Sequence, residues 1–237
     1  MIRFRPARAF AASLALAAGP VAALDTLPAD YTILPAGTTL GLGYLQYSTS
    51  DRLKVDGVGR VPDSSVDTTI GIARVLHYSQ IGGMPVGYQA FLPMASLSNL
   101  KIGGAKPGAA DGIGDLTLGV TAFVVRPSDA TRGTTVGVTG YLTVPTGEYD
   151  HDRPSVGSGT YAFTPQVGLI HGLGNGWFVD ASADIGFQKK HREAGLEYKT
   201  DPTTQLQGYL RYQPSAATSF AVGYSGLFGG KQDIGGV

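Results

Sequence analysis

Residues 177–188 read WFVDASADIGFQ, and apolar and polar side chains alternate along them with a period of two. A period of two predicts a β-strand that has one apolar face and one polar face. Residues 205–212 and 115–124 show the same alternation, so the pattern is not confined to one segment. On residues 177–188 the apolar face carries Trp177, Val179, Ala181, Ala183, Ile185 and Phe187, and the polar face carries Asp180, Ser182, Asp184 and Gln188.

This alternation predicts about nine strands, each of about ten residues, the length that a tilted strand needs to cross a membrane. Long and short connections alternate between them, which is typical of an outer-membrane barrel with long outer loops and short periplasmic turns. A soluble β-sandwich, the main alternative, gives no reason for this regularity. We therefore expect an all-β, antiparallel transmembrane β-barrel. Its predicted strands are residues 38–49, 65–78, 85–95, 113–126, 133–144, 159–171, 175–188, 203–213 and 217–228. The long loops are 50–64, 96–111, 145–158 and 189–202, and the short turns are 79–83, 126–129, 172–175 and 213–216.

The composition agrees with this expectation. Only 15% of the 237 residues are charged, below the roughly 25% of soluble proteins. The 35 glycines suit a curved sheet in which backbones approach closely. Lys+Arg and Asp+Glu are 18 each, so no basic excess exists to attract nucleic acid. The chain has no cysteine, and its stability must come from packing and from hydrogen bonding within the sheet.

The N-terminus has the pattern of a secretory signal peptide. Arg3, Arg5 and Arg8 precede an apolar stretch at residues 9–18, and small residues at 21–23 offer a cleavage site. The apolar stretch is too short for a membrane-spanning helix of about 20 residues. We expect residues 1–23 to be the signal peptide and residues 24–237 to be the barrel domain.

Two features do not fit a simple barrel. An odd number of strands leaves the chain end outside, whereas single-chain bacterial barrels have even numbers. Either the strand count is off by one or the chain is a fragment that ends in an outer loop, and we expect the fragment. Arg74 shares a face with Ile70 and Ile72. Either a bulge changes the face, or Arg74 and the isoleucines line the lumen; the sequence leaves both open.

The polar strand faces supply the candidate site residues. Asp180 and Asp184 are predicted to form an acidic patch opposite Arg211, which either orients polar solutes or belongs to an internal salt-bridge network. Asp115, in Gly112-Ile-Gly-Asp115, is expected to fix a loop-to-strand transition rather than to contact solute. The lumen-lining candidates are Asp115, Asp180, Asp184, Gln205, Gln207 and Arg211.

Several aromatic residues fall near predicted strand ends, where membrane barrels carry interfacial girdles. Aromatic residues are common in any strand, so this signal is weak by itself. The residues are Tyr44, Tyr47, Tyr78, Tyr141, Tyr161, Trp177, Tyr209, Tyr212 and Tyr224.

Catalytic and metal-binding patterns are weak. His151 and His191 lie in predicted outer loops, with Ser155 and Ser158 near the first, but no motif marks a nucleophile and its base. The carboxylates of residues 148–152 could bind Ca²⁺ through oxygen ligands, but they lack the spacing of a defined calcium loop. We therefore expect no catalytic residue, no metal site and no cofactor.

The segment Gly112-Ile-Gly-Asp-Leu-Thr-Leu-Gly119 resembles a signature of the MetA-pathway-of-phenol-degradation family of outer-membrane proteins. The resemblance implies an outer-membrane transporter for hydrophobic compounds, aromatics or long-chain lipids. It also implies a complete barrel of about 12 strands with a terminal aromatic residue, so Val237 departs from the family pattern. Similar blocks are residues 34–38, 137–150, 205–212 and 223–230.

These observations favour an outer-membrane channel for uptake of small hydrophobic or aromatic compounds. A structural or adhesive barrel with an occluded lumen is one alternative, and a lipid-modifying barrel enzyme that depends on His151 or His191 is another. The expected partners are the lipid bilayer with its lipopolysaccharide, the barrel-assembly machinery and a small hydrophobic solute, with no nucleic acid. The sequence does not identify the solute, an open or plugged lumen, or the oligomeric state.

Overall fold

The computed structural model describes residues 26–55, 59–108, 111–150, 155–193 and 196–235. The expected signal peptide at residues 1–23 lies outside the described residues, and so do His151 and Asp152. No helix in the described part of the chain is long and apolar enough to cross a membrane.

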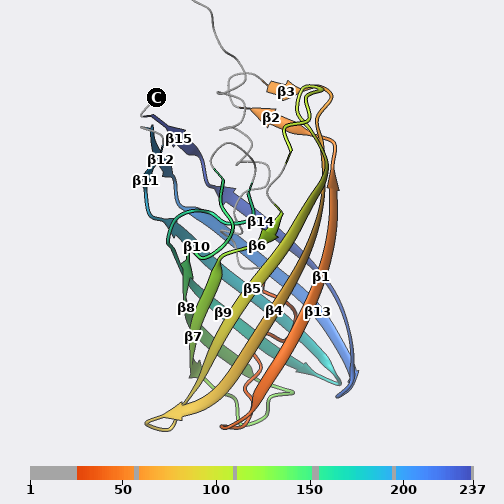
Figure 1. The fold of residues 1–237 in the computed structure, drawn as a ribbon. Helices are drawn as coiled ribbons and strands as arrows, with labels where there is room; N and C mark the ends of the chain where they lie inside the picture. Colours follow the sequence, from red (N-terminus) through yellow and green to blue (C-terminus); the bar gives the residue numbers. More distant parts are fainter. Residues whose placement is uncertain (1–25, 56–58, 109–110, 151–154, 194–195, 236–237) are drawn as a thin grey trace, which may run out of the picture.

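The described residues form antiparallel strands joined by turns and loops (Figure 1). Nine strands of ten residues or more make the wall of a barrel, and the shorter strands belong to the loops at one end. The long strands are β1 (Thr39–Ser50), β4 (Ser65–Ile81), β5 (Met84–Lys101), β7 (Leu116–Val125), β8 (Thr134–Val144), β9 (Ala162–Gly174), β10 (Trp177–Gln188), β13 (Thr203–Ser215) and β14 (Thr218–Gly229). The short strands are β2 (Leu53–Val55), β3 (Gly59–Val61), β6 (Gly112–Ile113), β11 (His191–Glu193), β12 (Leu196–Thr200) and β15 (Gln232–Ile234).

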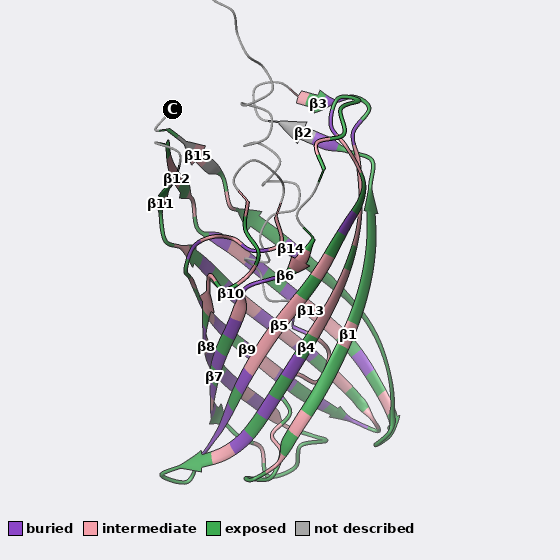
Figure 2. Cartoon of the chain, in the orientation of Figure 1, coloured by how far each residue is buried: buried purple, intermediate pink, exposed green. Residues whose placement is uncertain are grey.

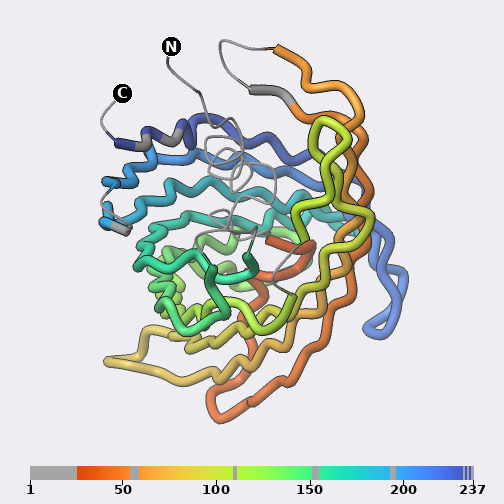
Figure 3. Tube along the Cα trace, turned by 45° about the horizontal axis from the view of Figure 1, so that its top comes forward, coloured from red at the N-terminus to blue at the C-terminus, as the bar shows by residue number. Residues whose placement is uncertain are grey.

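The long strands pair in chain order, β1-β4-β5-β7-β8-β9-β10-β13-β14, and β6 pairs with β5. Every pairing is antiparallel, and the sheet curls around a central space (Figure 3). Strands β1 and β14 stand at the two edges, and no pairing joins them within the described residues. Because successive long strands alternate in direction, β1 and β14 run the same way.

The nine strands predicted from the sequence are confirmed as the nine long strands, and the alternation of long and short connections is confirmed with them. The main differences concern the long loops. Strand β5 continues to Lys101 instead of ending near residue 95, because β4 pairs with it as far as Ser65. The loop expected at residues 50–64 contains the hairpin of β2 and β3, and β11, β12 and β15 form a small sheet of their own.

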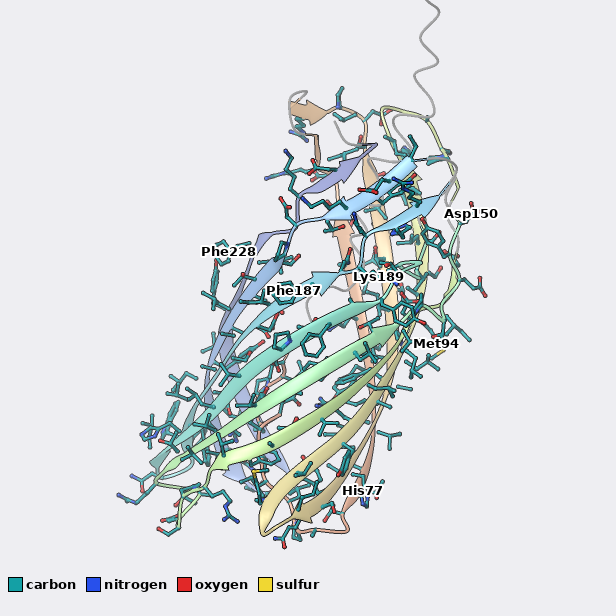
Figure 4. All side chains as sticks on the ribbon, turned by 90° about the vertical axis from the view of Figure 1, so that its left-hand side faces the viewer. His77, Met94, Asp150, Phe187, Lys189 and Phe228 are labelled. Carbon is teal, nitrogen blue, oxygen red and sulfur yellow. The ribbon has the colours of Figure 1, made fainter. Side chains whose placement is uncertain are left out.

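Burial alternates along the strands in the middle of the sheet, β7 to β10, whereas the edge strands β1 and β14 are mostly exposed (Figure 2). On β7, Thr117 and Thr121 are buried while Leu118 and Val120 are exposed, so the polar side chains face inward. Met94, Phe187 and Phe228 are exposed on the wall in Figure 4, where His77 lies at the end of the short turns and Asp150 lies toward the end of the long loops. An apolar exterior around a polar interior is the arrangement of a transmembrane barrel.

The interior also contains the main hydrophobic cluster. It combines inward side chains of the wall with residues of the segment that precedes β1, residues 26–37, called here the N-terminal segment. This segment lies inside the ring of strands in Figure 3. The buried members of the cluster are Tyr31, Leu76, Tyr78, Phe123 and Ile170, with Ile33, Leu34, Leu40 and Phe178 packed against them.

Candidate functional site: the barrel interior

Polar side chains from seven strands converge on the interior, because the residues of one strand parity all point inward. Most of them form hydrogen bonds there, as buried polar groups require. Thr139 is fully buried, and its hydroxyl lies 2.8 Å from that of Thr121 on the neighbouring strand. The buried polar residues of the long strands are Arg74, Gln89, Thr117, Thr121, Thr135, Thr139, Thr164, Gln166, Asp180, Ser182, Asp184, Thr203, Gln205, Gln207 and Arg211.

The N-terminal segment is bound to this polar interior through its backbone. The amide of Thr26 donates to Oε1 of Gln207 at 2.8 Å, and the hydroxyl of Tyr209 donates to the carbonyl of Thr26 at 3.0 Å. Farther along, the amide of Ala29 donates to Oδ1 of Asp180 at 3.4 Å. The wall therefore satisfies backbone groups that the segment could not satisfy by itself.

Tyr31 anchors the middle of the segment. Its hydroxyl donates to Oε1 of Gln166 at 2.8 Å and lies 3.1 Å from Oγ1 of Thr139. Its ring lies against two glycines of the wall: a Cβ atom at Gly168 would lie 1.9 Å from Cε2, and one at Gly137 would lie 2.6 Å from Cδ1. The absence of side chains at these two positions makes room for the ring.

Asp30 connects the segment to the charge on β4. Nη1 of Arg74 donates to Oδ1 of Asp30 at 2.8 Å, and Nη2 donates to Oε1 of Gln89 at 2.6 Å. Nη1 also donates to the hydroxyl oxygen of Tyr44 at 3.2 Å, and the guanidinium lies over the ring of Phe91. Arg74 therefore faces the lumen. No register shift separates it from Ile70 and Ile72, so these side chains share its inward face, and the bulge alternative is wrong.

Burial raises the pKa of the Asp30 carboxyl, although the Arg74 guanidinium acts in the opposite direction. Burial likewise raises the pKa of the Tyr31 hydroxyl, which therefore stays protonated as a hydrogen-bond donor.

Asp180 and Arg211 form a second ion pair. Nε of Arg211 donates to Oδ2 of Asp180 at 2.8 Å and Nη2 donates to Oδ1 at 3.2 Å, which is a two-point contact. The guanidinium lies 4.2 Å from the ring centroid of Phe178. Asp184 instead accepts a hydrogen bond from Nε2 of Gln166 at 3.0 Å. The structure thus separates the two aspartates that the sequence grouped as one acidic patch, and only Asp180 pairs with Arg211.

The other candidates occupy distinct places. Gln207 contacts the N-terminal segment, as described above, and Nε2 of Gln205 donates to Oγ of Ser225 on β14 at 3.0 Å. Asp115 precedes β7 and binds the loop after β8: its carboxylate accepts the amide of Gly147 at 2.9 Å and the amide and hydroxyl of Ser158 at 2.7 and 2.6 Å. All six candidate residues are buried, and their contact with a solute stays a prediction.

Tyr78 and Tyr141 do not belong to an interfacial girdle. Both are buried inside the barrel, and the Tyr141 hydroxyl accepts a hydrogen bond from Nε2 of Gln89 at 3.1 Å. Tyr44 and Tyr209 also turn their hydroxyls toward interior partners. For these four residues the girdle interpretation was wrong, because distance from a strand end does not show which face a residue occupies.

The described loop residues do not form a Ser–His pair. His191 stacks on Tyr198 with centroids 5.1 Å apart and meets Tyr149 edge-on, while the Ser158 hydroxyl is bonded to Asp115. Ser155 contacts the backbone of Asp150. No group of three potential metal ligands occurs within the described residues.

A cavity of about 500 Å³ lies at the end of the barrel that carries the short turns. Residues 32–36 of the N-terminal segment form one side of it, and Ile170, Phe178 and Arg211 contribute from the wall. The segment therefore narrows the lumen without filling it.

The comparisons with known proteins agree with this architecture. The family model described as "Putative MetA-pathway of phenol degradation" matches residues 50–236. The chain belongs to this family. It is also similar to a solved structure, the COG4313 outer membrane channel from Pseudomonas putida F1. The identity is 30%, the TM-score is 0.79, and the match covers 90% of this chain and 80% of that one. No curated protein matches this chain.

Sequence reasoning missed the role of the N-terminal segment. The available signal was Arg74, because an arginine in the middle of a strand calls for an acidic partner. Asp30 lies in the short stretch between the expected cleavage site and the first strand. Its proximity to Arg74 arises only once that stretch turns back into the barrel.

Proposed function

We propose that this protein is an outer-membrane channel for small hydrophobic or aromatic compounds. The observation that carries the proposal is a polar barrel interior that holds the N-terminal segment by hydrogen bonds and one ion pair while leaving a cavity beside it. Side-chain and backbone contacts of this kind can break and re-form without unfolding the wall, so the segment is a constriction that solutes pass when it shifts.

Two further features support hydrophobic solutes and a location in the outer membrane. Leu76, Tyr78, Phe123 and Ile170 give the interior an apolar zone near the short turns, which suits hydrophobic solutes better than sugars or ions. The apolar exterior suits lipid, and the structural relative is an outer membrane channel. The bilayer, its lipopolysaccharide and the barrel-assembly machinery are the partners that this location implies.

Planar-bilayer conductance tests the proposal. The protein is refolded with any strands needed to close the ring and measured with and without aromatic compounds or long-chain amphiphiles. Discrete conductance steps that these compounds alter are the expected result. A folded, heat-modifiable barrel that never conducts, even after the N-terminal segment has been removed, contradicts it.

The N-terminal segment inside the barrel favours one second candidate. If the N-terminal segment never moves, the barrel serves as a structural or adhesive component whose function lies in its long loops. Conductance of the intact protein separates the two functions, because in a channel the segment shifts without being removed, whereas a structural barrel conducts only after residues 26–37 are deleted. A lipid-modifying activity has weaker support, since His191 is engaged by two tyrosines.

A further inference from the structure

The cavity beside the N-terminal segment has the size of a small-molecule site, since such sites commonly span about 300–1,000 Å³. Its volume is about 500 Å³. It is bordered by the segment, by the ends of β4 and β5 next to their shared turn, by β8, β9, β10 and β13, and by the turn that follows β7. A molecule in it would touch both the movable segment and the fixed wall.

One part of the lining is apolar. Ile33 and Leu34 approach from the segment, and Ile170 and Phe178 approach from the wall. These four residues belong to the interior hydrophobic cluster or pack against it. They would accept an aromatic ring or a short alkyl chain, because burying such a group removes apolar surface from water on both partners.

The charged part of the lining is entirely basic. Arg126 and Arg211 line the cavity, whereas no aspartate or glutamate among the described residues does. Arg211 is already paired with Asp180, and its Nη1 donates to Oε1 of Gln213 at 2.5 Å. Arg126 is exposed, and its Nη1 donates only to the carbonyl of Gly83, at 3.3 Å; no carboxylate in the described part of the chain pairs with it.

We propose that this cavity binds amphipathic carboxylates, with the apolar body against Ile33 and Phe178 and the carboxylate at Arg126. A guanidinium offers parallel donors that match the two oxygens of a carboxylate. A cleft lined by one sign of charge also concentrates the opposite sign. The proposal rests on the channel function and narrows it, since it names ionised apolar acids as the solutes that the short-turn end of the lumen holds.

The test compares an acid with its uncharged amide. Binding of 4-phenylbutyrate and of 4-phenylbutyramide is measured by isothermal titration calorimetry on the full chain in lipid nanodiscs. The acid should bind more tightly than the amide. Arg126→Gln should lower the affinity for the acid by about tenfold and leave the affinity for the amide unchanged. Arg132→Gln is the matched control, because Arg132 is an exposed arginine of the same loop that does not line the cavity.

A second variant tests the apolar part of the site. Phe178→Ala should lower the affinities for the acid and for the amide by similar factors, because it removes the ring that both compounds would contact. Equal affinities for acid and amide in the wild type, or equal effects of Arg126→Gln and Arg132→Gln, overturn the proposal. Arg126 lies in a turn, so heat-modifiability of its variant reports folding separately from binding.

Conductance distinguishes failure of this proposal from failure of the channel function. A protein that conducts but binds acid and amide equally remains a channel and lacks the carboxylate site. A protein that binds the acid through Arg126 but never conducts has the site and is not a channel.

Discussion

Nη1 of Arg74 lies 2.8 Å from Oδ1 of Asp30, so the charge in the middle of β4 is matched by a charge from the N-terminal segment. Only 3% of the Arg74 side chain and 16% of the Asp30 side chain are exposed. An ion pair that is this buried is costly to break on one side, because the remaining charge stays in a poorly solvated place. The contact therefore couples the state of the barrel wall to the position of the segment.

Removing the arginine alone should release the segment. Arg74→Gln leaves the Asp30 carboxylate buried without its counter-ion, and the double variant Asp30→Asn with Arg74→Gln removes this imbalance. The chain has no cysteine, so a single Thr26→Cys reports exposure of the segment through its labelling rate. We expect about tenfold faster labelling in Arg74→Gln, which corresponds to about 1.4 kcal/mol. The double variant should return toward the starting rate, and equal rates in all variants would show that the pair does not hold the segment.

A methyl group at Gly168 should displace Tyr31. The added Cβ would lie 1.9 Å from Cε2 of the Tyr31 ring, so the ring must leave its place between the two glycines. We expect faster labelling of Thr26→Cys and a higher conductance. Gly208→Ala is the control, because a Cβ atom at Gly208 meets nothing within 4 Å. Similar effects of the two substitutions would count against Tyr31 as the anchor.

Acidification should favour the bound position of the segment. Burial raises the pKa of Asp30 in the bound segment above the ordinary value of 3.8. Asp30 therefore takes up a proton more readily when the segment is bound than when it is released and solvated. Binding of the segment to the barrel wall is strengthened as the pH falls through this higher pKa and weakened as the pH rises through it. Labelling of Thr26→Cys, corrected for reagent reactivity on an exposed cysteine, should slow toward acid pH. Asp30→Asn should remove the part of this pH dependence that comes from protonation of Asp30. A pH profile of the labelling rate that is the same in this variant as in the starting protein would contradict the prediction.

Asp115 should stabilise the loop after β8 rather than act on solutes. Asp115→Ala removes the acceptor for the amide of Gly147 and for the amide and hydroxyl of Ser158. The loss should be about 1–3 kcal/mol and should appear as faster proteolysis of residues 145–158. Asp129→Ala is the control, since Asp129 accepts similar bonds from Thr131 in an exposed turn at the opposite end. A change in solute-dependent conductance without faster proteolysis would assign Asp115 to the solute path instead.

Strand existence and side-chain orientation could be predicted because both depend on local pattern. The alternation in residues 177–188 correctly placed Asp180 inward and Val179 outward. The same reasoning failed for Tyr78 and Tyr141, since an aromatic residue suits the lipid interface and a packed interior equally well. It also left Arg74 undecided, because a single residue cannot reveal a partner more than 40 positions away.

The sequence by itself determined the antiparallel barrel wall, its strand order and the division between an apolar exterior and a polar interior, because a period of two and the lengths of the connections are properties of the chain. Only the tertiary structure decided what occupies the interior. The contacts of Tyr31 with Thr139 and Gln166, of Asp30 with Arg74 and of Thr26 with Gln207 join residues that are far apart in the sequence. Such contacts depend on the curling of the sheet around the N-terminal segment, which no local pattern encodes.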